Sequence, residues 1–151
     1  MREILFKAKR KDNGKWVEGY YVYHINRTIC PFGDSVKPED EQHVIMQDGF
    51  SDWNMPRDTV HFDITPKTLC QYTGLKDKNG KRIWENDIIR VENSIDEGTG
   101  VVEFYGGMWY VDKGVNNSLY DIMLYDDEAE VCVIGNIFDN PELLGQEGEE
   151  T

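Results

Sequence analysis

Residues 71–90 read QYTGLKDKNGKRIWENDIIR, and this stretch decides how the chain is organised. It holds two turns, Lys78-Asn79-Gly80 and Glu85-Asn86-Asp87, with short apolar runs before, between and after them. Asn, Asp and Gly tolerate the backbone angles of tight turns, so the pattern predicts an extended chain that reverses twice. We therefore expect the stretch to join two halves of a β protein, with residues 76–81 as a turn that faces solvent.

The rest of the chain carries similar short β-type runs. Residues 3–9 and 16–23 alternate in side-chain character on either side of Asn13-Gly14, which is the strongest short signal for an antiparallel hairpin. Pro141, at a first helical position, predicts a short C-terminal helix. Residues 119–124 fit either a strand or one helical turn. Further strands are predicted at residues 43–47, 59–64, 69–73, 87–92, 101–105, 108–112 and 130–134.

Short strands with Gly-bearing turns and hardly any helix predict a mainly β fold. We expect residues 1–85 to form an N-terminal β-rich subdomain, made of the hairpin, loops and short middle strands. This subdomain is expected to pack beside an SH3-like small β-barrel with a short C-terminal helix, in residues 86–145. Residues 146–151 are expected to form a disordered acidic tail.

Composition narrows the compartment and the class of protein. With 39% hydrophobic residues and 12% aromatics, the chain can build a core. It has no run of 18 apolar residues and no apolar signal-peptide region near its start, so we expect a cytoplasmic location. Cys30, Cys70 and Cys132 form no CxxC pair, and in a reducing compartment they are expected to be free and buried as small apolar residues.

The net charge of −13 is unevenly spread along the chain. Residues 1–30 carry seven Lys or Arg against three Asp or Glu, whereas residues 101–151 carry one against twelve. An acidic chain repels nucleic-acid phosphate and anionic lipid, so neither nucleic acid nor membrane is an expected partner. Opposite charge at the two ends favours self-association, and we expect a homo-oligomer.

Three blocks of the sequence point to a known family. They are the opening REILFKA, the central QYTGLKDKNGK with the following IWENDI, and the closing VIGNIFDNPELL. In this order, and over nearly the whole chain, they resemble the YopX family of phage and prophage proteins. Asn86 stands where that family more often has Gly, and Asn is the next-best residue for a left-handed turn. The resemblance implies a phage-type protein of a bacterial host with an SH3-like barrel in its C-terminal half, and it implies no reaction and no catalytic residues.

No motif supports catalysis, a cofactor or a strong metal site. The histidines are isolated from one another and from any Ser or Cys signature; they are His24, His43 and His61. The acidic run 126–128 with Glu130 lacks the spacing of a calcium loop, so we expect a solvated turn, with a weak Mg²⁺ contact as the alternative. Gly98-Thr99-Gly100 leads into a strand and fits a turn better than a phosphate site. We therefore expect the protein not to be an enzyme.

Protein binding is the function that we expect instead. Small barrels bind peptides through aromatic residues on one face. Four aromatic residues fall in the most acidic part of the chain, where they suit a basic protein segment, although the alternative is that they form the core; they are Tyr105, Trp109, Tyr110 and Tyr125. For the loop at residues 48–56 the same two interpretations apply, packing on the core and binding of a partner. Its apolar residues Phe50, Trp53 and Met55 are expected to cover an edge of the core, and an exposed binding loop is the alternative.

Two other functions stay open. One is nucleic-acid binding through a basic patch on the N-terminal hairpin, flanked by aromatic rings that can stack on bases. The patch consists of Lys7, Lys9, Arg10, Lys11 and Lys15, and the rings are those of Trp16, Tyr20 and Tyr21. Basic residues in a hairpin also serve as a solvated edge that discourages strand pairing. The other is an acidic DNA mimic or inhibitor of a host factor, which rests on net charge alone.

Overall fold

The computed structural model describes residues 1–92, 97–112, 118–120, 122 and 129–145. Its contacts divide the chain into two units, one of Met1 and Glu3–Gln71 and one of Arg2 and Tyr72–Thr151. Each unit is built from antiparallel strands, and the helices between them are short. The prediction of a mainly β protein with little helix is therefore confirmed.

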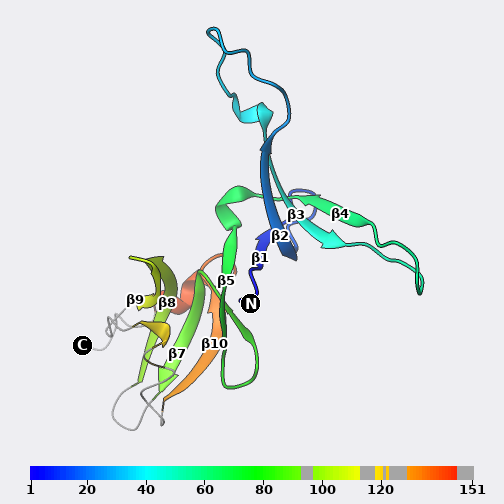
Figure 1. The fold of residues 1–151 in the computed structure, drawn as a ribbon. Coiled ribbons are helices and arrows are strands. Elements are labelled where there is room, and N and C mark those ends of the chain that lie inside the picture. Colours follow the sequence, from blue (N-terminus) through cyan, green and yellow to red (C-terminus); the bar gives the residue numbers. More distant parts are fainter. Residues whose placement is uncertain (93–96, 113–117, 121, 123–128, 146–151) are drawn as a thin grey trace. The chain divides into compact units, whose positions relative to one another are not determined.

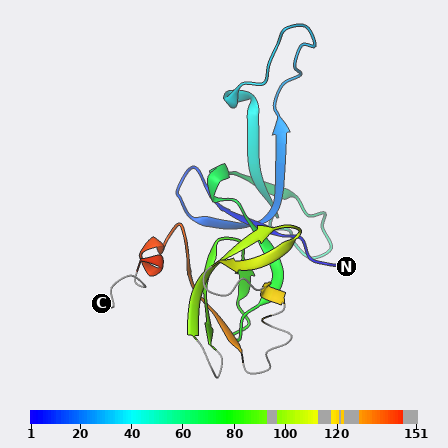
Figure 2. The ribbon, with the colours of Figure 1, turned by 90° about the vertical axis from the view of Figure 1, so that its left-hand side faces the viewer.

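The first unit is a sheet in the strand order β4-β3-β2-β1-β5 (Figures 1 and 2). The predicted N-terminal hairpin is confirmed, because Phe6 pairs with Gly19 and Lys9 pairs with Trp16. Gly14 takes a φ of 68° in its turn, a conformation that suits glycine. The elements are β1 (Phe6–Lys9), β2 (Trp16–Ile25), the 3₁₀ helix η1 (Pro38–Asp40), β3 (Glu41–Asp48), β4 (Thr59–Asp63), the 3₁₀ helix η2 (Pro66–Thr68) and the start of β5 (Cys70–Lys76).

Strand β2 pairs with two different neighbours along its length. Its residues up to Gly19 pair with β1, and those from Tyr20 onward pair with β3. Gly19 stands where the pairing changes, and a Cβ atom there would lie 2.3 Å from the backbone oxygen of Met46. No side chain fits at that distance, so the close approach of β2 and β3 requires glycine.

The core of the first unit is small. Its cluster of buried residues consists of Ala8, Val17, Ile45 and Ile64, and Phe6, Tyr21, Phe62 and Leu69 pack against it. Strand β3 is flanked by two loops, residues 26–37 ahead of η1 and residues 49–58 ahead of β4, which run out from opposite ends of this strand (Figure 1). Most residues of both loops are exposed.

The second unit contains a hairpin and a four-stranded antiparallel sheet in the order β10-β7-β8-β9. The meander predicted for residues 87–92, 101–105 and 108–112 is confirmed as β7, β8 and β9. In the part of the chain that the structure describes, β9 and β10 lie at the two edges of an open sheet, so the expected SH3-like barrel is not confirmed. The elements are the rest of β5, β6 (Arg82–Trp84), β7 (Asp87–Glu92), β8 (Glu97–Tyr105), β9 (Met108–Asp112), β10 (Glu130–Asn136) and the 3₁₀ helix η3 (Pro141–Leu144).

Two further predictions for this unit concern helical turns. The short helix η3 begins at Pro141, as expected. Within residues 119–124 the structure describes Leu119, Tyr120 and Ile122, which are helical. The backbone N–H of Ile122 donates to the backbone oxygen of Ser118 at 3.1 Å, so the helical alternative applies to these residues. The tail at residues 146–151 lies outside the described residues.

The core of the second unit is larger and includes the β5–β6 hairpin. Its buried residues are Ile83, Ile89, Val102, Val111, Leu119, Ile122, Val131 and Val133. Because Ile83 of β6 and Leu75 of β5 belong to or pack on this cluster, the hairpin folds with the second unit. The contacts therefore divide the chain after Gln71.

The turn at residues 76–81 faces solvent except at Asp77, which is 7% exposed. One carboxylate oxygen, Oδ1, accepts hydrogen bonds from the backbone N–H groups of Asn79 and Lys81, both at 2.9 Å. The other, Oδ2, accepts one from Val133 of β10 at 3.0 Å. Burial raises the pKa of the Asp77 carboxyl, but the three backbone donors together outweigh burial and hold that pKa below its usual value. One side chain thus shapes the turn and ties it to the sheet.

The second turn of the stretch, at residues 85–87, forms where the sequence predicts it. Asn86 has a φ of 66°, the left-handed conformation for which Asn is suited. Asp87, which follows it, is 2% exposed and accepts a hydrogen bond from the backbone N–H of Trp84 at 2.8 Å. Tyr72 is buried, and its ring lies 5.4 Å from that of Trp84 between centroids. Polar side chains therefore fix the backbone of this unit from inside.

Candidate protein-binding surfaces

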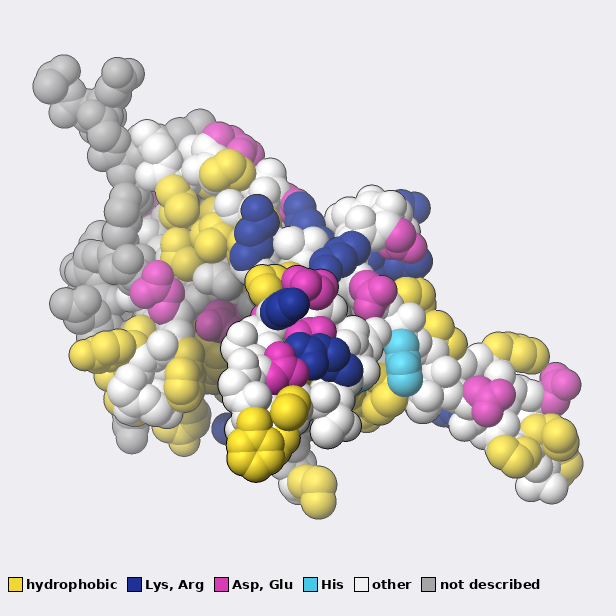
Figure 3. All heavy atoms as spheres, turned by 90° about the horizontal axis from the view of Figure 1, so that it is seen from above, with side chains coloured by type: hydrophobic (Ala, Val, Ile, Leu, Met, Phe, Trp, Pro, Cys, Tyr) yellow, Lys and Arg dark blue, Asp and Glu magenta, His cyan; other side chains and the backbone are white. Residues whose placement is uncertain are grey.

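The loop at residues 49–58 carries large apolar side chains that are almost fully exposed. Trp53 is 95% exposed, Phe50 is 90% exposed and Met55 is 63% exposed. Figure 3 shows hydrophobic side chains gathered at the end of this β3–β4 connection. The expectation that these residues cover an edge of the core is wrong, because the loop runs beyond a core that other residues already fill. The alternative of an exposed loop applies.

Hydrogen bonds close this loop on itself. The backbone N–H of Gly49 donates to the oxygen of Asp58 at 2.6 Å, and that of Met55 donates to the oxygen of Asp52 at 3.2 Å. Asn54, inside the tight turn, has a φ of 64°. The loop therefore presents its aromatic rings from a defined turn, which lowers the entropy cost of ordering them against a partner.

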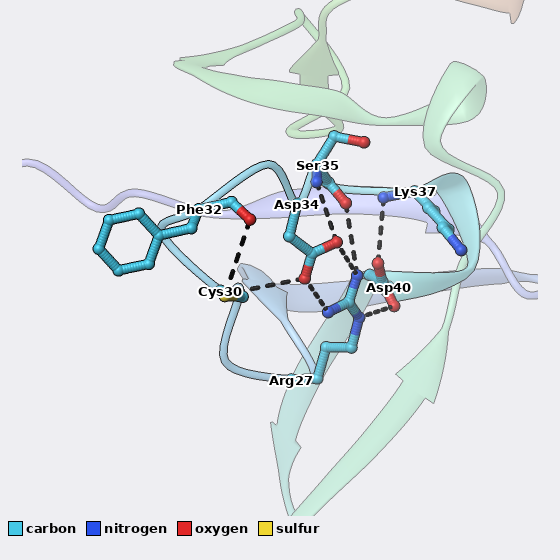
Figure 4. Close-up of polar contacts among 7 residues, drawn as sticks. All are labelled: Arg27, Cys30, Phe32, Asp34, Ser35, Lys37 and Asp40. Atoms are coloured by element: carbon cyan, nitrogen blue, oxygen red, sulfur yellow. Dashed lines mark hydrogen bonds and ion pairs between the residues drawn. The ribbon is translucent and has the colours of Figure 1, made fainter.

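The loop at residues 26–37 is held by a clamp around Arg27 (Figure 4). Its guanidinium donates to Asp34 at 2.8 Å from Nη1 and to Asp40 at 2.7 Å from Nε. Asp34 also accepts the backbone N–H groups of Cys30 and Ser35. The hydrogen bond from Arg27, followed by that from Cys30, lowers the pKa of Asp34 to about 2.

The ring of Phe32 lies outside the Arg27 clamp. Phe32 is 89% exposed, and in Figure 4 its ring points away from Arg27. Cys30, in the same loop, is exposed, so the expectation of three buried cysteines is wrong for this one because its loop lies outside the core. Cys70 is buried as expected and Cys132 is half-buried.

The tip of the β8–β9 hairpin is a second group of exposed apolar side chains. Tyr105 is 78% exposed, Phe104 is 54% exposed and Met108 is 48% exposed. The ring of Tyr110 lies 6.4 Å from that of Tyr105, edge on. Phe104 and Trp109 point to the opposite face from Tyr105 and Met108, since side chains alternate along a strand, and their rings lie 4.9 Å apart between centroids. Trp109 packs partly buried on the core.

The four aromatic residues singled out in the sequence therefore do not form one surface among the described residues. Tyr105 and Tyr110 lie together, whereas Trp109 contributes to the core, as the alternative interpretation held. Tyr125 lies outside the described residues. Sequence reasoning missed Phe32, Phe104 and Met108. For Phe32 a signal was present, since it stands between Pro31 and Gly33, where chain reversal leaves little room for burial.

The basic patch of the N-terminal hairpin is largely occupied by its own neighbours. The ammonium groups of Lys7 and Lys9 lie 4.8 and 5.4 Å from the centre of the Trp16 ring. The Arg10 guanidinium lies 4.3 Å from the centre of the Phe62 ring and donates to Asp12 at 2.9 Å. These contacts cover the indole with cations. Lys11 and Lys15, the other members of the patch, are exposed.

The tyrosines beside this patch differ in exposure. Tyr20 is 54% exposed. Tyr21 is half-buried against Phe6, and its hydroxyl lies 2.6 Å from Nδ1 of His43. Burial, followed by the charge of Glu41, raises the pKa of the Tyr21 hydroxyl. Tyr21 is thus a packing residue and Tyr20 a surface residue.

The three histidines lie in different surroundings. His43 contacts Tyr21, and His61 lies 3.4 Å from the hydroxyl of Thr59, whereas His24 is exposed. Within the described ranges, no three His, Cys, Asp or Glu side chains gather as ligands of a metal ion. The acidic run at 126–128 lies outside those ranges. None of the helices described is both long enough and apolar enough to cross a membrane.

The fold and its surfaces define a class, a mainly β protein of two antiparallel units with aromatic side chains displayed on loops. Residues 5–145 match the family model described as YopX protein, and the chain belongs to this family. The resemblance seen in the sequence is therefore confirmed. No curated protein that was compared with the chain matches it.

A solved structure shares the fold. The crystal structure of protein EF1440 from Enterococcus faecalis is similar with a TM-score of 0.55 and 23% sequence identity. The similarity covers 95% of this chain and 99% of that one. At this identity it supports the fold alone.

Proposed function

We propose that the chain is a protein-interaction module that acts through contacts and carries out no reaction. The observation that carries this proposal is the loop at residues 49–58, on which Phe50, Trp53 and Met55 are exposed together. Clustered exposed apolar residues mark interaction sites, and Trp is among the residues that contribute most to binding energy at interfaces. The backbone bonds that close the loop support the same role.

The β8–β9 tip supports a second contact of the same kind, suited to a basic segment. Tyr105 and Met108 are exposed there beside Glu103, in the part of the chain with the largest excess of acidic residues. Aromatic rings next to carboxylates favour Lys- or Arg-bearing partners. An SH3-like closure of residues 86–145 also stays a proposal, supported by the β7-β8-β9 meander.

The rival functions have less support. Nucleic-acid binding through the N-terminal hairpin needs rings that stack on bases. Trp16 already has Lys7 and Lys9 beside it and Tyr21 packs against Phe6, which leaves Tyr20 as the exposed ring of the three. A DNA mimic or inhibitor of a host factor is supported by the net charge of −13. We further propose that the protein works in the cytoplasm of a bacterial host and that it is of phage origin.

The test compares the tagged wild-type chain with Trp53→Ser and Phe32→Ser in bacterial cells that also express a second, differently tagged copy. Both rings are almost fully exposed, so neither change reaches the core, and thermal unfolding checks that. We expect the proteins recovered with the wild type, host proteins or the second copy, to be lost with Trp53→Ser and kept with Phe32→Ser. Recovery that is indifferent to Trp53→Ser would contradict the role of the loop.

A further inference from the structure

Strand β4 is an edge strand of the first unit, and its backbone bonds reveal which of its groups face outward. The N–H of Ile64 donates to the oxygen of His43 at 3.1 Å, and the N–H of Gly49 donates to the oxygen of Asp58 at 2.6 Å. Alternate residues of an antiparallel strand bond to the same neighbour. Thr59, His61 and Asp63 therefore direct their backbone groups away from β3.

The outer side of this strand is open over a short length. At its far end the N–H of Lys11 donates to the oxygen of Asp63 at 2.9 Å, which fits the alternation and closes that end. Among the residues that the structure describes, no backbone bond reaches the outer groups of Thr59 or His61. An open strand edge is a template for another strand.

We propose that this edge binds the β4 strand of a second copy of the chain, antiparallel and centred on Val60. The inference rests on the proposed protein-binding role and names its partner and site. In this register Thr59 of each copy lies opposite His61 of the other, and each such pair exchanges two backbone hydrogen bonds. Val60, which is 40% exposed, lies opposite Val60 of the second copy.

The same register brings opposite charges together. Arg57 reaches the end of the partner strand that holds Asp63, twice by symmetry. Because segment 9–11 occupies the outer backbone side of Asp63, the two residues would meet there through their side chains and not as a strand pair. Arg57 is exposed and pairs with Asp48 at 3.2 Å, a surface contact weak enough to be exchanged. Centring the pair on His61 instead would place Thr59 against Asp63, whose backbone oxygen is already bonded to Lys11. The open groups of β4 therefore favour Val60 as the centre.

The aromatic loop would then meet a surface of opposite charge. Beyond Arg57, residues 49–56 continue past the closed end of the partner strand, where segment 9–11 bonds to β4. The acidic residues of the loop and its stem are Asp48, Asp52 and Asp58, with Arg57 as the basic one. The basic residues of the 9–15 segment are Lys9, Arg10, Lys11 and Lys15, with Asp12 as the acidic one. Lys11 and Lys15 are the exposed members of this set, and cations beside aromatic rings stabilise such a contact.

The area is sufficient for a dimer. Four aromatic side chains, Phe50 and Trp53 from each copy, supply about 600–1,000 Å² at 150–250 Å² per ring. Stable interfaces bury at least about 1,200 Å² of surface in total, and the paired strands add their own buried area to that of the aromatic rings.

Sedimentation of the full chain over micromolar concentrations tests the proposal. His61→Pro removes an N–H that points outward, so it leaves the bonds between β3 and β4 in place. We expect a wild-type dimer whose dissociation constant rises at least tenfold in His61→Pro and in Arg57→Glu. The double change Arg57→Glu with Asp63→Arg should restore dimerisation, and Phe32→Ser should not affect it.

Cross-linking tests the register independently. In a Cys30→Ser background, Val60→Cys places two thiols opposite each other in a pair without mutual hydrogen bonds, where Cβ atoms come within about 4.5–5.5 Å. Oxidised glutathione should convert this variant to a covalent dimer. Val22→Cys is the matched control, since Val22 is 36% exposed on β2 and lies outside the proposed interface.

The outcomes separate the two proposals. A chain that is monomeric throughout, or cross-linking through Val22→Cys as strong as through Val60→Cys, overturns the β4 dimer. If Trp53→Ser still loses recovered host proteins in that case, the protein-binding function stands with a different partner. If nothing is recovered in either experiment, both proposals fail.

Discussion

The two units of this chain differ in the exposure of one tryptophan each, Trp84 and Trp53, and in the size of their cores. In the second unit Trp84 is 4% exposed, and Asp77 and Asp87 are buried with hydrogen bonds to the backbone. In the first unit Trp53 is 95% exposed and Phe32 is 89% exposed, on loops fixed by turns and ion pairs. Among the residues that the structure describes, eight buried residues form the core cluster of the second unit, against four in the first.

This difference supports the proposed binding role of the first unit. A larger core with buried, satisfied carboxylates specifies one backbone arrangement and suits a scaffold. A small core with anchored, exposed rings keeps apolar surface available for a partner, at the cost of stability that burial would supply. The four predictions below test the contrast, from the largest expected effect to the smallest.

Replacing each tryptophan by alanine gives the largest contrast. Trp84→Ala should cost about 3–5 kcal/mol of unfolding free energy, because it empties a buried site beside Tyr72. Trp53→Ala should change stability by less than about 0.5 kcal/mol. Urea unfolding followed by circular dichroism measures both, and similar losses in the two variants would contradict the contrast.

Asp77→Ala should destabilise the second unit by about 3 kcal/mol, because it leaves three backbone N–H groups without their charged acceptor. Glu103→Ala, at an exposed position of the same unit, is the control. Since the folded-state pKa of Asp77 lies below the usual 3.8, its contribution is present above that pH and is lost as the pH falls through the folded value. The gap between wild type and variant in denaturant midpoint should therefore narrow on acidification, and a constant gap would argue against this role.

Gly19→Ala should cost about 1–3 kcal/mol in the first unit, because the new Cβ would lie 2.3 Å from a backbone oxygen of β3. Gly98→Ala is a matched control in the second unit, with no heavy atom within 4 Å of the new Cβ and no positive φ. Thermal unfolding of both variants makes the comparison, and an unchanged melting temperature for Gly19→Ala would show that β2 and β3 can separate at no cost.

The smallest effect is local and concerns the Arg27 clamp. Because the pKa of Asp34 is lowered to about 2, the stabilisation by its carboxylate is present above the ordinary 3.8 and is lost only as the pH falls through about 2. The carboxyl carbon of Asp34 should titrate near 2 in an NMR experiment. In Arg27→Ala the midpoint should rise, and the amide of Cys30 should exchange faster. If the titration midpoint of Asp34 is unchanged in Arg27→Ala, the Arg27 clamp is not the cause of the lowered pKa.

Local signals in the sequence predicted much of the fold. The Asn13-Gly14 hairpin, the left-handed Asn86, the β7-β8-β9 meander and the start of η3 at Pro141 all follow from turn chemistry between near neighbours. The family also follows from three blocks of sequence. These features depend on residues a few positions apart, so a pattern can reveal them.

The exposure of side chains did not follow from the sequence. The same apolar pattern describes Trp109, which packs on the core, and Phe50 and Trp53, which do not. Which of them is buried depends on whether segments distant in the sequence cover the loop, and that is a property of the whole fold.

The sequence by itself determined that this chain is an acidic, mainly β protein of the YopX family whose strands turn at residues 76–87. Only the tertiary structure decided that Asp77 belongs to the interior, that the β5–β6 hairpin folds with the second unit, and that β4 keeps an open edge beside an aromatic loop. The physical reason is the separation along the chain of the residues that interact. Turn chemistry acts between neighbours in the chain, whereas burial, a carboxylate that bonds to a strand 56 residues away, and the open side of a strand depend on contacts between distant segments.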